Sequence, residues 1–255
     1  AELLDRAGGN PFFLEELARA ARDHSDLDAV ARVPETVQDV LAARVDRLPE
    51  EPRRVLQTAS VLGREFPLRL LERVWDGAAP VGPQLTELTR LEFIHELQGV
   101  DERVFVFKHA LTQDVAYDGL LTSRRKRLHE AAGAALEELY AGRLEEAYDR
   151  LAYHYSQTDR SDKAVHYLDR FAERAVRTYA HAEAAKALRE ALVHVERLPA
   201  DERERRAVDL VRRLVNSLYF LGRFGESLDL RLHQEAAVER IGDPWLSGPF
   251  SMWLG

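Results

Sequence analysis

The residue with the clearest capacity for chemistry is His109. It follows the apolar run Phe105-Val106-Phe107, which predicts a strand, and it precedes a stretch that predicts a helix. An imidazole in that position can donate a hydrogen bond to a phosphate oxygen, and the amide groups at a helix N-terminus favour the same anion. The alternative role is structural, with the ring bonded to a neighbouring backbone carbonyl. The residues alone leave both roles open.

A second candidate is the turn formed by Gly8, Gly9 and Asn10 before Pro11. Proline suits the first position of a helix, because its missing N–H would be unpaired there in any case. Asn10 is a suitable N-cap for the same helix. On local chemistry, the turn needs no role beyond starting this helix.

The common catalytic patterns are absent from the sequence. It contains no Gly-x-x-x-x-Gly-Lys-Ser/Thr phosphate loop, no nucleophile elbow and no zinc-binding His-Glu-x-x-His motif. His154 and His166 lie at a spacing that does not suit a shared metal, so we expect no metal site. We therefore expect no catalytic residue and no autonomous ATP hydrolysis in this chain.

The elements that position these residues are almost all helical. Apolar residues with a 3.6-residue period predict helices from Pro34, from Pro49, over 66–75 and around Leu85–Leu91. Strands follow at about 93–97 and 104–107, with Gly99 and Asp101 in the turn between them. Helices followed by one hairpin are the outline of a winged helix. This hairpin is the only β signal in the sequence.

From about Leu121 onward the sequence predicts helices alone. The segment 148–155, followed by Ala164 and Leu168, fits the two helices of a tetratricopeptide repeat (TPR). A similar small–large–small pattern at Ala184, Leu188 and Ala191 comes only about twenty residues later, so the repeats are irregular or one helix is shared. A further helix pair is predicted at 201–222 and 225–241. Aromatic residues at helical spacing can line a ligand groove, although we expect them in the inter-repeat core: Tyr148, Tyr153, Tyr155, Tyr167, Phe171 and Tyr179.

Two motifs together resemble the C-terminal half of a STAND-class (AAA-type) signalling ATPase. They are the run from Gly9 to Leu17 (GNPFFLEEL) and the run from Phe105 to Tyr117, which contains His109. The resemblance extends over roughly residues 1–200. It implies that Pro11 touches the adenine from a helical lid, and that His109 faces the nucleotide phosphates from a winged helix.

The resemblance also implies the cofactor and its ligands. Gly9, Pro11 and His109 are the implied nucleotide-binding residues, and ATP or ADP is held mainly by an N-terminal domain outside this chain. One departure concerns Ala110, because many relatives carry Asp there and that Asp would help to fix the histidine. A similar His-Ala pair occurs in the bacterial subgroup linked to class III nucleotide cyclases.

The implied domains are a lid remnant at 1–30, a winged helix at 31–125 and truncated TPR-like repeats at 126–255. In such a protein the winged helix clamps ADP at rest, and a protein or small-molecule signal at the repeats releases the clamp. Exchange for ATP and oligomerisation follow. The implied partner of this chain is its own ATPase domain, and the output is a cyclase or a transcriptional domain.

Two other functions stay open. The first is a free-standing TPR-like adaptor that binds a protein without nucleotide. The second is a DNA-binding winged helix, against which charge argues: the expected recognition helix, 84–93, sets Arg90 against Glu87 and Glu92. The basic run 124–127 is interpreted as a solvated helix face or as a contact to the ATPase core.

Composition agrees with a cytoplasmic signalling protein. A net charge of −8 and a pI near 5.7 argue against a broad nucleic-acid surface. The absence of cysteine excludes disulfides and thiolate metal sites and permits the cytosol. No apolar stretch approaches the roughly 18 residues of a membrane span. Because the one methionine is Met252 and the first residue is Ala1, we expect a piece of something longer.

Overall fold

The computed structural model describes residues 36–98 and 102–241. The chain divides between Leu128 and His129 into two compact units, which are described separately below. The predicted lid remnant, with Gly9 and Pro11, lies outside the described residues. The domain boundaries predicted from the sequence stay predictions.

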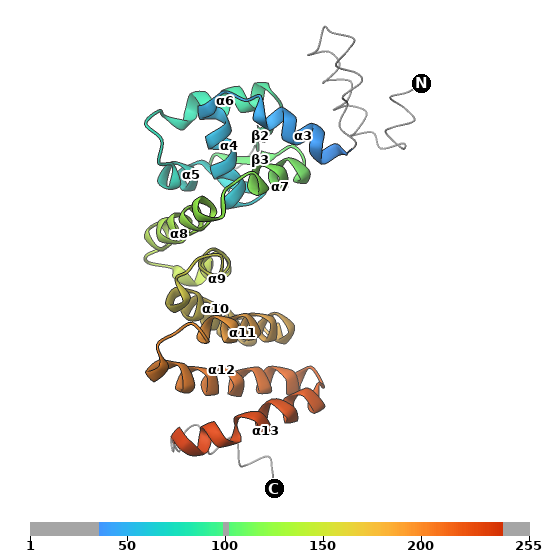
Figure 1. Cartoon of the computed structure of the whole chain (residues 1–255), viewed down its shortest axis with the longest axis vertical. Coiled ribbons are helices and arrows are strands. Elements are labelled where there is room, and N and C mark those ends of the chain that lie inside the picture. The colour runs from blue at the N-terminus through green and yellow to red at the C-terminus, as the bar shows by residue number, and fades with distance from the viewer. Residues whose placement is uncertain (1–35, 99–101, 242–255) are drawn as a thin grey trace, which may run out of the picture. The chain divides into compact units, whose positions relative to one another are not determined.

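The first unit is a helical domain with one three-stranded sheet, drawn in blue to green in Figure 1. Its elements are α3 (Val37–Asp46), α4 (Glu50–Leu62), β1 (Glu65–Pro67), α5 (Leu68–Val74), α6 (Val81–Arg90), β2 (Ile94–Glu96), β3 (Val104–Phe107) and α7 (Ala110–Asp118). Both strand pairings are antiparallel, and the strand order is β1-β3-β2. Helix, strand, two helices and a hairpin in this order are the topology of a winged helix, as the sequence predicts.

The strand β1 corrects the sequence prediction, which had a helix over 66–75 and a single hairpin. Instead, Phe66 pairs with Phe105 of β3, and α5 begins only at Leu68. Pro67 has the extended backbone of an N-cap (φ −67°, ψ 138°), which prevents an earlier helix start. Phe66 is fully buried, with its ring 6.0 Å from that of Phe105 and 5.8 Å from that of Phe107. A strand of three residues is too short to show the alternation that identifies strands.

Helix starts in this unit are fixed by capping residues. The predicted start at Pro34 moves to Val37, because the Thr36 hydroxyl accepts the N–H of Asp39 at 3.1 Å. Pro49 and Pro80 take the extended backbone of N-caps before α4 and α6. The helix that the sequence places around Leu85–Leu91 therefore begins earlier, at Val81.

The second unit begins within α8 (Thr122–Leu139) and is helical throughout its described part. It continues with η2 (Leu144–Ala147), α9 (Tyr148–Ser156), α10 (Ser161–Arg177), α11 (His181–Val195), α12 (Ala200–Phe220) and α13 (Phe224–Ile241). From α9 to α13 each helix packs against the next in a stack, drawn from yellow to red in Figure 1. This stack is the TPR-like solenoid predicted from the sequence. Each of α10, α11 and α12 packs against both of its neighbours, so the contacts do not single out one helix as shared between two pairs.

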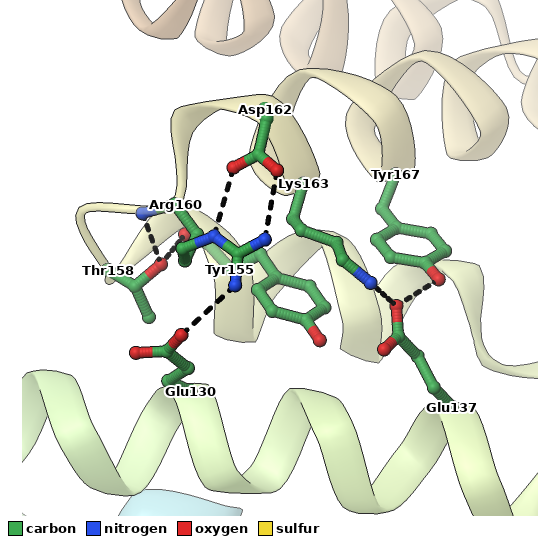
Figure 2. A network of polar contacts seen from close by, with 8 residues as sticks. All are labelled: Glu130, Glu137, Tyr155, Thr158, Arg160, Asp162, Lys163 and Tyr167. Carbon is green, nitrogen blue, oxygen red and sulfur yellow. Dashed lines mark hydrogen bonds and ion pairs between the residues drawn. The ribbon is translucent and has the colours of Figure 1, made fainter.

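A polar network joins α8, α9 and α10 at the start of the stack (Figure 2). Glu137 of α8 accepts hydrogen bonds from the ammonium of Lys163 and the hydroxyl of Tyr167, each at 2.5 Å. Arg160 donates to Glu130 at 3.2 Å and, through two N–H groups, to Asp162 at 3.1 and 3.0 Å. Burial alone would raise the pKa of Glu137, yet the bonds from Lys163 and Tyr167 lower it. The carboxylate therefore stays charged and holds α10 to α8.

Gly133 of α8 provides the space for the largest buried side chain of this unit. Tyr155 is 2% exposed, and its ring stacks on Tyr167 with centroids 5.5 Å apart and an interplanar angle of 9°. A Cβ on Gly133 would lie 2.7 Å from the Cζ of Tyr155. The side chain cannot swing away, because the Tyr167 ring is stacked against it.

We expect Gly133→Ala to lower the free energy of unfolding by about 1 kcal/mol. Overpacking against Tyr155 costs roughly 1–3 kcal/mol, and the better helix propensity of alanine returns about 1 kcal/mol. The matched control is Gly225→Ala in α13, where an added Cβ meets nothing within 4 Å and stability should rise. Urea unfolding followed by circular dichroism measures both. A Gly133→Ala protein more stable than the parent would contradict the packing.

Candidate functional site

His109 lies between β3 and α7, where the sequence places it. It is the N-cap residue of α7, with an extended backbone (φ −134°, ψ 140°) and a half-buried side chain. Its side chain does not cap the helix, and the first turn of α7 carries no acidic residue. The end of α7 therefore keeps the positive dipole that favours an anion. Gly9 and Pro11, the other two implied ligands, lie outside the described residues.

Basic side chains near the recognition helix α6 and the hairpin are paired with carboxylates. Arg90 donates twice to Glu87, at 2.8 and 2.7 Å, and Arg103 donates twice to Glu96, at 2.7 and 3.0 Å. These bonds lower the pKa of both glutamates. Lys108 lies 3.0 Å from a further carboxylate on the same unit. This pairing reinforces the charge argument against a DNA-binding surface on the described part of the winged helix.

The basic run 124–127 has a structural role that the sequence did not indicate. Arg124 donates to Asp76 at 3.2 and 2.9 Å, and Arg54 reaches the same carboxylate at 3.3 Å. Arg125 donates to the carbonyl of Tyr117 at 3.0 Å and lies over its ring, 4.1 Å from the centroid. These two arginines bind their own unit. The interpretation of the whole run as a solvated face or a contact to another domain is therefore wrong for its first half.

His154 pairs with His129 and not with His166. Their Nδ1 atoms lie 3.0 Å apart, and both side chains are buried between α8 and α9. Tyr153 meets both rings edge-on. Burial, the facing His129 and nearby Arg150 lower the pKa of His154 to about 3. Within the described residues no three His, Cys, Asp or Glu side chains converge as metal ligands.

The repeat unit contains a groove that the sequence did not predict. Its volume is about 520 Å³, and it lies among α10, α12 and α13 with Leu188 of α11 at its floor. Its lining residues are Ala172, Glu173, Val176, Arg177, Leu188, Arg212, Arg213, Val215, Asn216, Tyr219, Phe220 and Arg231. Apolar side chains line it together with a few polar ones, which is the usual make-up of a small-ligand site.

Ion pairs hold the guanidinium groups of this groove in place. Arg213 lies 2.9 Å from Asp169 and 3.2 Å from Asp209, and Arg212 donates to Asp209 at 2.9 Å. Arg177 pairs with Glu145 on the same unit. Burial raises the pKa of Asp169, although Arg213 opposes this effect. Three of the four arginines that line the groove are therefore held by carboxylates of the same unit.

Only some of the aromatic residues that the sequence places in the inter-repeat core are buried there. Tyr155 and Tyr167 are buried in the core as expected, whereas Tyr153 and Tyr179 are 50% and 86% exposed. The aromatic residues that line the groove are Tyr219 and Phe220. The sequence contained a pattern that could have predicted the α12 side of this groove. An i, i+4, i+7, i+8 spacing places four of its residues on one helical face: Arg212, Asn216, Tyr219 and Phe220.

In the part of the chain that the structure describes, no helix is long and apolar enough to cross a bilayer. No family model matches the chain. No curated protein matches it.

Among solved structures, the chain is similar to a signal transduction ATPase with numerous domains (STAND) that carries a tetratricopeptide repeat sensor, from Pyrococcus horikoshii. The identity is 13% and the TM-score 0.40, over 98% of this chain. The chain spans 40% of the length of that protein. A likeness of this size supports no inference about function.

Proposed function

We propose that this chain is the regulatory half of a STAND-type ATP-binding signal-transduction protein. Its winged helix contacts the nucleotide held by an N-terminal ATPase domain, and its repeats receive the signal. Two features support this role: the winged-helix unit is followed directly by a helical-repeat unit, and the GNPFFLEEL and His109 motifs resemble that class.

The observation that carries the proposal is the position of His109. It is the N-cap residue of α7, where an imidazole N–H and the helix dipole act on the same anion. Among the residues that the structure describes, His109 offers one contact to a phosphate, which agrees with a chain that clamps a nucleotide bound mainly elsewhere. Neither phosphate-loop nor catalytic motifs occur in the sequence, so hydrolysis belongs to the parent protein.

The regulation that follows is a two-state equilibrium. At rest, the contact from His109 favours the closed, ADP-bound state, because only that state offers the phosphate to the imidazole. A signal that binds the repeats better in the open state shifts the population towards exchange. The nucleotide-cyclase or transcriptional output, and oligomerisation on activation, belong to this proposal as properties of the parent protein.

We expect His109→Ala in the parent protein to weaken ADP binding about tenfold or more and to raise basal signalling. A hydrogen bond to a charged group contributes roughly 1.5–3 kcal/mol, and 1.4 kcal/mol corresponds to a factor of ten. Retention of radiolabelled ADP after gel filtration measures the effect. The control is His95→Ala, an exposed histidine on β2 of the same unit. Unchanged ADP retention would remove the phosphate role.

A simpler experiment separates this proposal from the alternative, a free-standing adaptor, which the groove in the repeats also supports. The coding DNA upstream of Ala1 is sequenced. A Gly-x-x-x-x-Gly-Lys-Ser/Thr loop within about 200–250 codons, the size of one large domain, supports the ATPase parent. A start codon close to Ala1 without such a loop leaves the adaptor.

A further inference from the structure

The groove among α10, α12 and α13 has the chemistry of a ligand site. Its volume of about 520 Å³ falls within the range of small-molecule pockets, roughly 300–1,000 Å³. Four arginines and one glutamate are among its lining residues. Carboxylates pair with Arg177, Arg212 and Arg213, so an anion is recognised here by the N–H groups that these pairs leave unused and not by an excess of positive charge. The apolar lining residues and the two aromatic residues favour contact with an apolar part of the same ligand.

The polar side of the groove is preorganised and still has hydrogen-bonding capacity. Arg212 donates to Asp209 through Nη2, and a guanidinium offers five N–H groups. Asn216, one turn further along α12, is exposed, and its side chain makes no hydrogen bond to the described residues. Because Asp209 already fixes Arg212, an incoming anion gains its bonds without first ordering that side chain.

The apolar side is formed by the end of α12. Phe220 is 62% exposed, and its ring stacks on His181 with centroids 4.5 Å apart. Tyr219 meets Phe224 edge-on at 5.3 Å. Each aromatic ring is therefore held by a neighbour while it lines the groove, which suits contact with a flat ligand.

We propose that this groove binds a small organic anion with a flat apolar body. Its anionic group meets Arg212 and Asn216, and its body lies against Tyr219 and Phe220. The inference rests on the proposed function in one respect: it names the class of signal that the repeats receive.

The test uses the whole chain and two fluorescent probes of similar shape. Anilinonaphthalene sulfonate is an aromatic anion, and phenylnaphthylamine is its neutral counterpart. We expect one sulfonate dye to bind per chain, phthalate to displace it, and the neutral dye to bind at least tenfold more weakly. Arg212→Gln should weaken binding of the sulfonate dye about tenfold, because a charge-assisted hydrogen bond is lost. The neutral dye should be unaffected by this substitution.

Two further variants protect the test against misfolding. Asn216→Asp changes an exposed side chain without changing its size, and it adds a negative charge that repels the sulfonate. Binding of the sulfonate dye should therefore also weaken, while the circular dichroism spectrum stays unchanged. Arg197→Gln removes an exposed arginine that does not line the groove, and should change nothing. Equal binding of the two dyes, or insensitivity to both Arg212→Gln and Asn216→Asp, overturns the proposal.

An acidic peptide is the competing occupant. If the pentapeptide Glu-Glu-Phe-Glu-Glu displaces the dye at lower concentration than phthalate does, the groove is a peptide site and the small-molecule proposal is wrong. Dye binding needs no nucleotide, so the groove proposal can be rejected without rejecting the proposed function. Loss of the dye site with ADP retention intact rejects the groove alone, and an ineffective His109→Ala rejects the nucleotide role alone.

Discussion

Tyr155→Ala will lower the free energy of unfolding by about 4 kcal/mol. The side chain is 2% exposed and stacks on Tyr167, and truncation of a buried aromatic residue costs roughly 3–5 kcal/mol. The loss is large because the ring fills the space that Gly133 leaves open on α8. Urea unfolding of the whole chain, followed by circular dichroism, measures it.

The control for this prediction is Tyr155→Phe, which keeps the ring and removes the hydroxyl next to Glu137. It should cost only about 1 kcal/mol, the value of one hydrogen bond. Burial and the Glu137 carboxylate raise the pKa of Tyr155, so the hydroxyl stays protonated and its removal changes no charge. Equal losses for Tyr155→Ala and Tyr155→Phe would show that the hydroxyl, and not the packed ring, carries the stability.

A double substitution tests the contact itself. In a Tyr155→Ala background the Cβ of Gly133→Ala no longer meets a ring, so the same change should become stabilising by up to about 1 kcal/mol. A reversal of sign is the signature of direct contact. An effect of Gly133→Ala that is the same in both backgrounds would contradict it.

Lowering the pH from 7 to 5 will reduce the free energy of unfolding by about 2 kcal/mol through His154. The pKa of this residue is about 3 in the folded protein, against an ordinary value of 6.5. Between these values the folded chain keeps His154 neutral while the unfolded chain binds a proton. Each pH unit then favours the unfolded state by about 1.36 kcal/mol. The stability is fully present above 6.5 and is lost as the pH falls.

The geometry explains why His154 resists protonation. Its Nδ1 lies 3.0 Å from the Nδ1 of His129, and the pair is enclosed between α8 and α9 with Arg150 near His154. A proton on the ring would place a positive charge in a buried site that has another cation as its neighbour. A neutral pair needs only one N–H between the two nitrogens.

The pH effect is checked by urea unfolding at pH 7, 6 and 5 with two variants. His154→Gln removes the titrating group and should reduce the pH dependence by about 2 kcal/mol over this range, leaving the contributions of His166 and His194, whose pKa values are also lowered by burial. His233→Gln changes an exposed histidine of α13 and should leave it as in the parent. Wild type and His154→Gln with the same slope would show that another group is responsible.

The elements that could be predicted from the sequence are those with a long or distinctive residue pattern. The helix α12 and the turn at Gly222 were predictable, because a long amphipathic period and a glycine at φ +71° leave strong signals. The strand β1 was not, because three residues before a proline show no alternation.

For the candidate sites, the sequence predicted positions that depend on neighbouring residues but not contacts between residues far apart in the sequence. His109 was predictable as the residue between a strand and a helix, since its position depends on neighbouring residues. The partners of Arg124 and His154 were not, because Asp76 lies 48 positions from Arg124 and His129 lies 25 positions from His154. The groove combines residues of four helices, and the sequence showed only the part on α12, through the spacing of its residue types.

The continuous packing from α9 to α13 limits how this protein can be dissected. Since α10, α11 and α12 each pack against both of their neighbours, removing any one of them leaves a face of each neighbour bare. A fragment that began at α11 would expose the buried face carrying Ala184, Leu188 and Ala191 to water. A shortened chain therefore loses the least packing when helices are removed from an end of the described stack.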